Sequence, residues 1–373
     1  MYFRTIFSIA LSAVVAWATN SALASQPGTV GAVYTMTNAT NAAGGNQVLV
    51  YDRLADGSLS FAEAYATGGD GSGDGLGSQG GVILSDNHRW LLVVNAGSNE
   101  ISVFEVEKDG LTLMDREDSG GVRPVSVAIH GDLVYVVNAG SDSVFGLRLN
   151  QHGELEPIGD PSPLSGGDTD PAQIGFSPDG KFLLVTEKAT NSIDVWPVDK
   201  EGLIGAPNVN GASGETPFAF GFGHRNQLFV SEVFGGAEGE GAVSSYALGR
   251  GGDLAVIAGS VPNHETAPCW LVVTNSGQYL FTTNTPDDSL SAYSIDFEGE
   301  LELVDADGRT GEPGEGTNPL DMDLSDDGRF LYTLNIGDDT ISTFRVMPDG
   351  GLDLLLDLPV AEIPAGVNGL AAR

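Results

Sequence analysis

Residues 177–185, Ser-Pro-Asp-Gly-Lys-Phe-Leu-Leu-Val, decide the fold of this chain. Proline presets φ and glycine accepts positive φ, so the first four residues predict a turn, and the apolar run after them predicts a buried strand. An apolar run before the turn (172–176) and an alternating segment after it (192–198) add two more short strands. A second turn at 199–202 leads to Leu203, where a fourth strand begins.

The same four-strand unit recurs about every 49 residues. Fixed periods of this size indicate repeat arrays, solenoids or propellers, and four antiparallel strands per period are typical of a propeller blade. We therefore predict an all-β fold, a seven-bladed β-propeller. Each copy is marked by a glycine-containing turn followed by a leucine, and the seven leucines are Leu59, Leu111, Leu155, Leu203, Leu254, Leu301 and Leu352.

The first copy of the repeat is incomplete at its start. Residues 31–37 already have the pattern of a second strand, and no first strand precedes them. Residues 366–372 look like an inner strand without a blade of its own. We expect this C-terminal strand to complete blade one and close the ring, because a closed ring leaves only short, protected strand edges.

Residues 1–24 have the pattern of a secretory signal peptide. A short positive segment ends at Arg4, residues 5–18 are mostly apolar, and Ala22-Leu23-Ala24 fits a cleavage site. The apolar segment is too short to span a bilayer. We expect cleavage after Ala24, one propeller domain over residues 25–373, and a secreted or periplasmic location without membrane insertion.

Composition limits the partners and cofactors. The chain has 51 acidic and 16 basic residues, a formal net charge of −35, and this field repels nucleic acids and anionic membranes. The single cysteine, Cys269, permits no intramolecular disulfide. His and Cys show no metal-site spacing, so we expect no metal and no cofactor. The loop 70–75 resembles a calcium loop in composition but lacks its terminal glutamate, so a connector is favoured and calcium is the alternative.

Candidate site residues follow from the topology of a propeller, whose ligands usually bind at one mouth of the central channel. The starts of inner strands and the ends of second strands reach that mouth. Five second-strand ends are asparagine, which commonly caps turns, whereas blades four and five carry Glu187 and Glu232 there. The predicted substrate-binding residues are Gln79, Gln173, Lys188, Asp321 and Asn368.

Glu187 and Glu232 are the predicted catalytic carboxylates, because two such groups near a channel can serve as acid and base. Arg123, the only arginine at an inner-strand start, is predicted to hold a carboxylate or polarise a carbonyl. The alternative is structural, with Glu187, Lys188 and Arg123 forming ion pairs between blades. We expect a monomer, since the sequence carries no oligomerisation signal.

Residues 177–185, with 191–196 and Gly202-Leu203, resemble the seven-bladed propeller lactonase family, which includes bacterial 6-phosphogluconolactonases and fungal 3-carboxymuconate cyclases. The resemblance extends over the whole chain after residue 24. It implies hydrolysis or isomerisation of a small lactone or carboxylate, with Glu187 as the channel glutamate and Arg123 as the basic residue. It also implies a histidine directly after an inner-strand proline. Those positions here hold Val125, Ala172, Phe218, Cys269 and Leu320.

Two functions therefore stay open, and whether the chain is an enzyme stays open with them. The first is a lactonase-like enzyme in which Glu187 or Glu232 activates water. The second is a non-catalytic propeller of the cell envelope that binds a ligand or a protein. The scarcity of basic residues and the expected export argue against a phosphorylated sugar as substrate.

Overall fold

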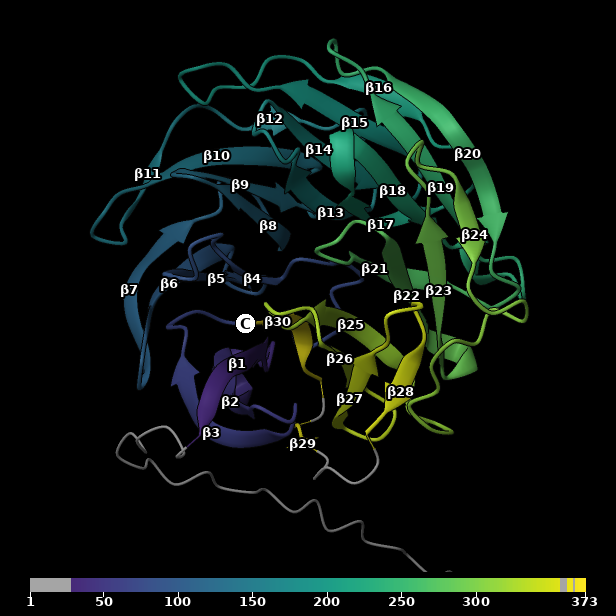
Figure 1. Ribbon diagram of the computed structural model, residues 1–373. Coiled ribbons are helices and arrows are strands. Elements are labelled where there is room, and N and C mark those ends of the chain that lie inside the picture. The colour runs from purple at the N-terminus through teal and green to yellow at the C-terminus, as the bar shows by residue number, and fades with distance from the viewer. Residues whose placement is uncertain (1–27, 356–360, 365) are drawn as a thin grey trace, which may run out of the picture.

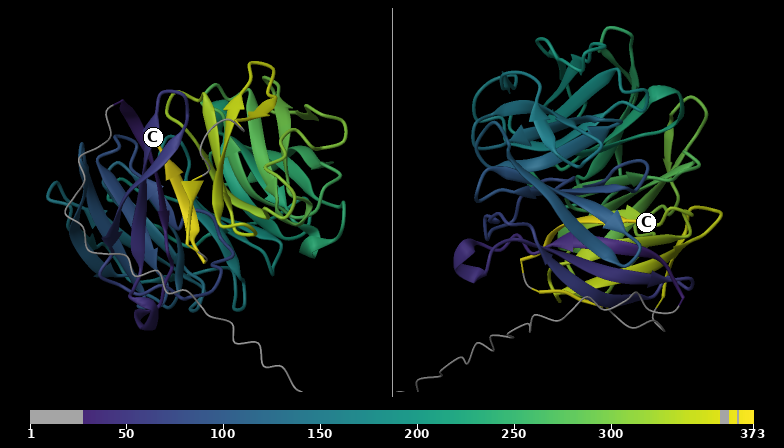
Figure 2. Two further views of the ribbon diagram at one scale, coloured as in Figure 1. Left: turned by 90° about the horizontal axis from the view of Figure 1, so that it is seen from below. Right: turned by 90° about the vertical axis from the view of Figure 1, so that its left-hand side faces the viewer.

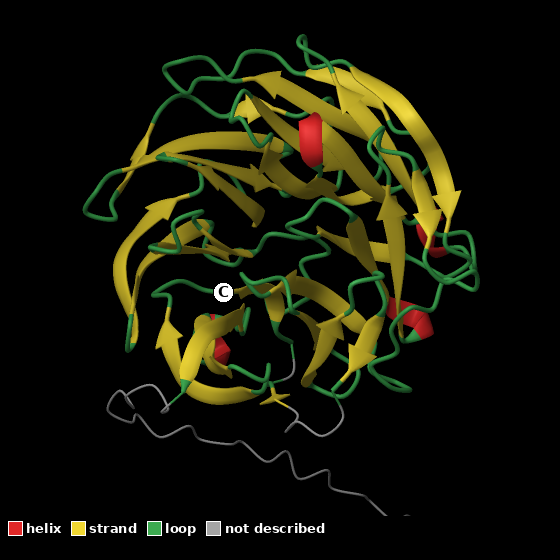
Figure 3. Ribbon diagram, viewed as in Figure 1, coloured by secondary structure: helices red, strands yellow, loops and turns green. Residues whose placement is uncertain are grey.

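The structure, a computed structural model, describes residues 28–355, 361–364 and 366–373. Seven antiparallel sheets stand around a central axis (Figure 1). The described helices are single 3₁₀ turns (Figure 3), namely η1 (Asn41–Ala43), η2 (His224–Asn226), η3 (Phe234–Gly236) and η4 (Thr285–Asp287). The predicted seven-bladed β-propeller is confirmed. The predicted signal peptide, residues 1–24, lies outside the described residues.

Blades one to four carry the N-terminal half of the ring. Blade one consists of β30 (Asn368–Ala372), β1 (Thr29–Met36), β2 (Gln47–Leu54) and β3 (Leu59–Ala66). Blade two consists of β4 (Val82–Leu84), β5 (Trp90–Asn95), β6 (Glu100–Glu107) and β7 (Gly110–Asp118). Blade three consists of β8 (Pro124–His130), β9 (Leu133–Asn138), β10 (Ser143–Leu149), β11 (Leu155–Pro157) and β12 (Ser162–Pro163). Blade four consists of β13 (Pro171–Phe176), β14 (Phe182–Glu187), β15 (Ser192–Pro197) and β16 (Asn208–Gly211).

Blades five to seven complete the ring. Blade five consists of β17 (Pro217–Phe222), β18 (Gln227–Glu232), β19 (Ala242–Leu248) and β20 (Leu254–Pro262). Blade six consists of β21 (Pro268–Val273), β22 (Tyr279–Asn284), β23 (Ser289–Ile295) and β24 (Leu301–Leu303). Blade seven consists of β25 (Pro319–Leu324), β26 (Phe330–Asn335), β27 (Thr340–Val346), β28 (Leu352–Leu354) and β29 (Ala361–Glu362).

The C-terminal strand closes the ring, as predicted. β30 pairs antiparallel with β1, with Ala372 opposite Val33 and Leu370 opposite Thr35. Beyond β30, the Arg373 N–H donates to the Ala32 carbonyl at 2.9 Å. Side views show this yellow strand against the purple strands of blade one (Figure 2). The innermost strand of the first blade therefore comes from the opposite end of the chain.

The glycine of each repeated turn is where one blade rests on the blade before it. All seven glycines have positive φ, between 82° and 147°. A Cβ on any of them would lie within 3.2 Å of a side chain in the preceding blade. The backbone conformation and the close approach together explain why the repeat keeps glycine there. These residues are Gly57, Gly110, Gly153, Gly202, Gly252, Gly299 and Gly350.

The inner strands of blades three to seven begin at proline. Each of these strands carries a register shift directly after its proline. The residue before each proline has a positive φ, so the chain turns a tight corner into the inner strand. These corner residues are Arg123, Asp170, Thr216, Ala267 and Asn318.

The turn glycines yield a stability prediction. In Gly57→Ala the new Cβ would meet the buried Phe330 ring at 2.6 Å and would also hold a φ of +96°. We expect the free energy of unfolding to fall by about 2–4 kcal/mol, from the strained φ and the overpacking together. Urea unfolding of the variant and the parent measures the difference.

The matched control is Gly205→Ala, because that glycine has ordinary φ and nothing lies within 4 Å of its Cβ position. We expect no loss of stability there, since alanine restricts the unfolded chain slightly more than glycine does. Equal unfolding midpoints for the two variants would contradict the role given to the blade contact.

Candidate functional site

Residues 76–80, called the plug here, cross the axis of the ring at the end where the inner strands begin. The Ser78 carbonyl accepts the Trp270 indole N–H at 3.1 Å, and the Ser78 hydroxyl donates to the Val125 carbonyl at 2.8 Å. The Gln79 amide donates to the Leu271 carbonyl at 3.0 Å and accepts from the Leu271 N–H at 3.1 Å. The plug therefore ties blade two to blades three and six, and it occupies the mouth at which the sequence places the site.

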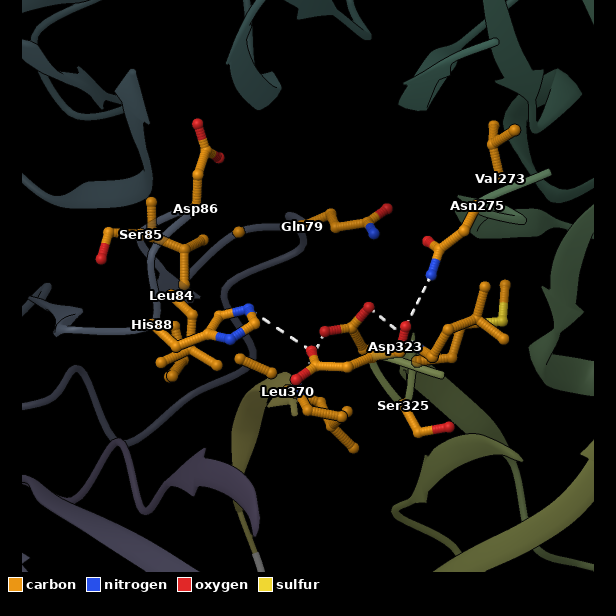
Figure 4. A pocket seen from close by; sticks show the side chains of 18 of the residues that line it. Gln79, Leu84, Ser85, Asp86, His88, Val273, Asn275, Asp323, Ser325 and Leu370 are labelled. Atoms are coloured by element: carbon orange, nitrogen blue, oxygen red, sulfur yellow. Dashed lines mark hydrogen bonds and ion pairs between the residues drawn. The ribbon is translucent and has the colours of Figure 1, made fainter. Parts of the chain in front are cut away.

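A cavity of about 660 Å³ lies on the axis beyond the plug and opens at the opposite end of the ring. Gln79 and Gln173 lie at its inner end, and the inner strands β4, β25 and β30 form its wall. Turns that follow the inner strands supply Asp86, His88 and Asn275 around its opening (Figure 4). We call this space the central cavity.

Asp323 is the carboxylate in the wall of the central cavity. It lies in β25, half-buried, and its oxygens accept the Ala372 N–H at 2.9 Å and the Leu324 N–H at 2.8 Å. Burial raises the pKa of Asp323 to about 7, against the opposing effect of these two hydrogen bonds. The carboxyl group can therefore exist in either protonation state near neutral pH.

An ion pair spans the opening of the central cavity. The His88 imidazole of blade two lies 3.4 Å from the Asp326 carboxylate of blade seven (Figure 4). The Asn275 amide of blade six donates to the Asp326 carbonyl at 2.9 Å. Because both partners of the ion pair are more than a third exposed, the pair adds little stability. Together with the Asn275 hydrogen bond, it links blades two, six and seven at the opening.

The predicted catalytic carboxylates lie inside blades four and five. Glu187 is fully buried and accepts the Ser165 N–H at 2.9 Å, the Ser165 hydroxyl, and the Thr190 hydroxyl at 2.6 Å. Glu232 is also fully buried and accepts hydrogen bonds from a glycine N–H and two serine hydroxyls. Neither lines the central cavity. Both occupy the second-strand ends where other blades have buried asparagines, so their hydrogen bonds hold the loops of their own blades.

The remaining predicted residues divide among four places. Gln79 and Gln173 line the central cavity, where the Gln173 amide also pairs with the backbone of Phe220 at 2.7 and 3.1 Å. Asp321 lies buried between β25 and β30, where it accepts the Leu370 N–H at 3.1 Å and burial raises its pKa well above the usual range.

Lys188 and Asn368 hold the plug. The Lys188 ammonium donates to the Gly77 carbonyl at 2.7 Å, and the Asn368 side chain accepts the Leu76 N–H at 3.2 Å. Burial lowers the pKa of Lys188, partly offset by Asp170. Arg123 is a half-buried corner residue, and within the described ranges no carboxylate forms an ion pair with it. The predicted ion-pair set between Arg123, Lys188 and Glu187 is therefore not formed.

Cys269 and the loop 70–75 show no sign of a reactive or metal-binding role. Burial raises the pKa of the Cys269 thiol to about 12, so the thiol is protonated at neutral pH. Asn38 bonds to Ser72 and to the Asp74 carbonyl, which fixes the loop against blade one. Among the described residues, no group of three His, Cys, Asp or Glu side chains could hold a metal ion. Calcium binding stays an untested alternative.

Sequence reasoning missed Asp323, His88 and Asp326. One signal was present, since Asp323 occupies in blade seven the inner-strand position of Gly175 in blade four and Val272 in blade six. An acidic residue at an inner-strand position that is Gly or Val in these blades breaks the repeat. His88 and Asp326 carry no such signal, because polar residues are ordinary in turns.

Comparison with known proteins agrees with this architecture. The family model described as "Lactonase, 7-bladed beta-propeller" matches residues 44–167 and 225–353. The chain belongs to this lactonase family. A 6-phosphogluconolactonase of Pectobacterium carotovorum subsp. carotovorum is 26% identical over 291 residues, which cover 74% of this chain and 83% of that protein. The resemblance predicted from residues 177–203 is therefore confirmed.

Solved structures related to this lactonase-family chain share its fold. The Pseudomonas aeruginosa periplasmic gluconolactonase PpgL has a TM-score of 0.69 at 19% identity, with 91% of this chain and 99% of that chain covered. A Lactobacillus plantarum protein has a TM-score of 0.73 at 17% identity, with 92% and 100% covered. In the described part of the chain, no helix has the length and apolar character needed to cross a membrane.

Asp194 beside Glu187 gives a pH-dependent stability prediction. Asp194 is fully buried, and neither of its carboxyl oxygens has a hydrogen-bond donor among the described residues. Burial and then the neighbouring Glu187 raise its pKa to about 8. Because the folded pKa exceeds the unfolded value, the parent should lose stability as the pH rises from about 4 to about 8, and then level off.

Asp194→Asn removes this titration. We expect the variant to gain at least about 2 kcal/mol over the parent between pH 4.5 and pH 8.5, measured by urea unfolding at both values. Glu302→Gln, at an exposed position on β24, is the control and should follow the parent. A constant difference between Asp194→Asn and the parent across this range would contradict the raised pKa.

Proposed function

We propose that this protein is an exported hydrolase that opens an uncharged lactone in the central cavity. The charge of the cavity carries the proposal, together with membership of the lactonase family. The residues around the cavity include the carboxylates Asp86, Asp323 and Asp326 and no lysine or arginine. Such a lining repels a phosphorylated lactone, whereas it can form hydrogen bonds with the hydroxyl groups of a neutral one.

The two kinds of named relative differ in the charge of the lactone. The Pectobacterium relative is named a 6-phosphogluconolactonase, and the Pseudomonas aeruginosa neighbour a gluconolactonase. Lys188 bonds to the plug and Arg123 lies close enough to act on its charge, and both stay outside the lining of the central cavity. This distribution of charge favours the unphosphorylated lactone for this chain.

The size and polarity of the central cavity suit a sugar lactone. Its volume of about 660 Å³ lies within the range of small-molecule sites. The amides of Gln79, Gln173 and Asn275 add hydrogen-bonding groups to a wall that mixes polar and aliphatic side chains. Polar groups at fixed positions can orient a small ligand that carries several hydroxyl groups.

Export is the second part of the proposal, and it rests on the signal-peptide pattern of residues 1–24. A net charge of −35 also suits a protein that stays dispersed outside the cytoplasm. We expect the protein recovered from outside the cytoplasm to begin at Ser25, as measured by intact mass. Recovery of the full-length chain from the cytoplasm alone would contradict export.

The substrate part is tested by lactone hydrolysis in a pH-stat, corrected for spontaneous opening of the ring. We expect kcat/KM for glucono-δ-lactone to exceed that for 6-phosphogluconolactone by at least about 10-fold at low ionic strength. The ratio should shrink as added salt screens the repulsion. A preference for the phosphorylated lactone would contradict the proposed substrate.

A binding propeller without catalysis is the second candidate. It is favoured by the burial of Glu187 and Glu232, because neither predicted carboxylate can reach a ligand in the central cavity. Saturable binding of glucono-δ-lactone or its hydroxy acid, with no turnover across aldonolactones, muconolactones and acyl-homoserine lactones, would establish this candidate and exclude the enzyme.

A further inference from the structure

We propose that Asp323 is the general base that activates water for lactone hydrolysis, with the Gln79 and Gln173 amides as donors to the carbonyl oxygen. This inference rests on the proposed function and names the groups that would perform it. It moves the chemistry from the mouth covered by the plug to the inner part of the central cavity.

Position singles out Asp323 among the carboxylates of the central cavity. Asp86 and Asp326 are exposed in turns at the opening, where water solvates them. Asp323 lies inside, half-buried in β25, between the opening and the two glutamines at the inner end. A lactone held at the inner end would therefore meet one carboxylate that is shielded from bulk water.

The surroundings of Asp323 suit a group that accepts and returns a proton. A pKa of about 7 places both protonation states within reach at neutral pH, which is the condition for efficient general acid–base catalysis. The titratable groups around it are Asp326, which raises the pKa further, and Asp321 two residues earlier in the strand, while His88 across the opening contacts Asp326. From β30 it receives only the Ala372 N–H.

The hydrogen bonds of Asp323 also fix its orientation. Each carboxyl oxygen accepts one backbone N–H and keeps a second lone pair for a water molecule. Gln79 and Gln173 are fixed in the same way. The amide of each donates one N–H to a backbone carbonyl, and its oxygen accepts a backbone N–H. The second amide hydrogen of each glutamine is left to donate to a developing oxyanion.

The reaction balances without a further reactant. The Asp323 carboxylate takes a proton from water while the water oxygen bonds to the lactone carbonyl carbon, whose π electrons move to the carbonyl oxygen. The tetrahedral intermediate then re-forms the C=O bond, the ring C–O bond breaks, and the ring oxygen takes the proton from Asp323. The product is a hydroxy acid, which releases one proton to solvent on ionising, and Asp323 returns to its starting state.

The test is the turnover of glucono-δ-lactone by Asp323→Asn, followed by pH-stat. We expect kcat to fall by about 10²–10⁴-fold, the usual contribution of a general base, with a smaller change in KM. Asp194→Asn is the control, because it removes another carboxyl of raised pKa that lies away from the central cavity. It should keep kcat within about 3-fold of the parent.

The pH profile of the parent is a second measurement that needs no variant. We expect kcat/KM to rise with an apparent pKa near 7, and we expect Asp323→Asn to lose this rise. A profile that is flat from pH 5 to pH 9, or an Asp323→Asn variant that keeps the parent kcat, would overturn the role of Asp323 and leave the proposed function standing. A parent that opens no lactone at all would overturn both.

Discussion

The ring depends on one pairing, that of β1 with β30. A blade of four short strands cannot bury its faces alone, so each blade relies on its two neighbours. The first blade lacks an inner strand until residues 368–372 return to supply it. Without this pairing, the first and seventh blades would each expose a face, and β1 would present an unpaired edge.

The same joint brings structure and candidate chemistry together. β25 and β30 are neighbouring inner strands, and the carboxylates Asp321 and Asp323 bridge them by accepting the N–H groups of Leu370 and Ala372. Burying a carboxylate is costly, so a side chain that bonds to the N–H groups of a strand is usually neutral. Asp323 is held in the cavity wall by the strand that closes the ring, and its pKa is raised because it is buried there.

The two ends of the channel differ because of a single loop. The plug fills the end where the inner strands begin, and its backbone groups bond to blades one, three, four and six. The cations Arg123 and Lys188 lie at that end, whereas the carboxylates lie around the open end. In a chain of net charge −35, Arg123 and Lys188 therefore stay outside the lining of the central cavity.

The sequence by itself determined the repeat, the blade and the closure of the ring. Turn glycines such as Gly57 and inner-strand prolines such as Pro171 are dictated by local backbone geometry, so they can be read from residue order. Only the tertiary structure decided where the candidate site lies. Glu187 broke the asparagine pattern in the sequence, yet it lies bonded inside its own blade. Asp323 and His88 come from blades seven and two, which are far apart in the sequence. They meet at the central cavity only because the ring closes, and no local sequence pattern could predict this.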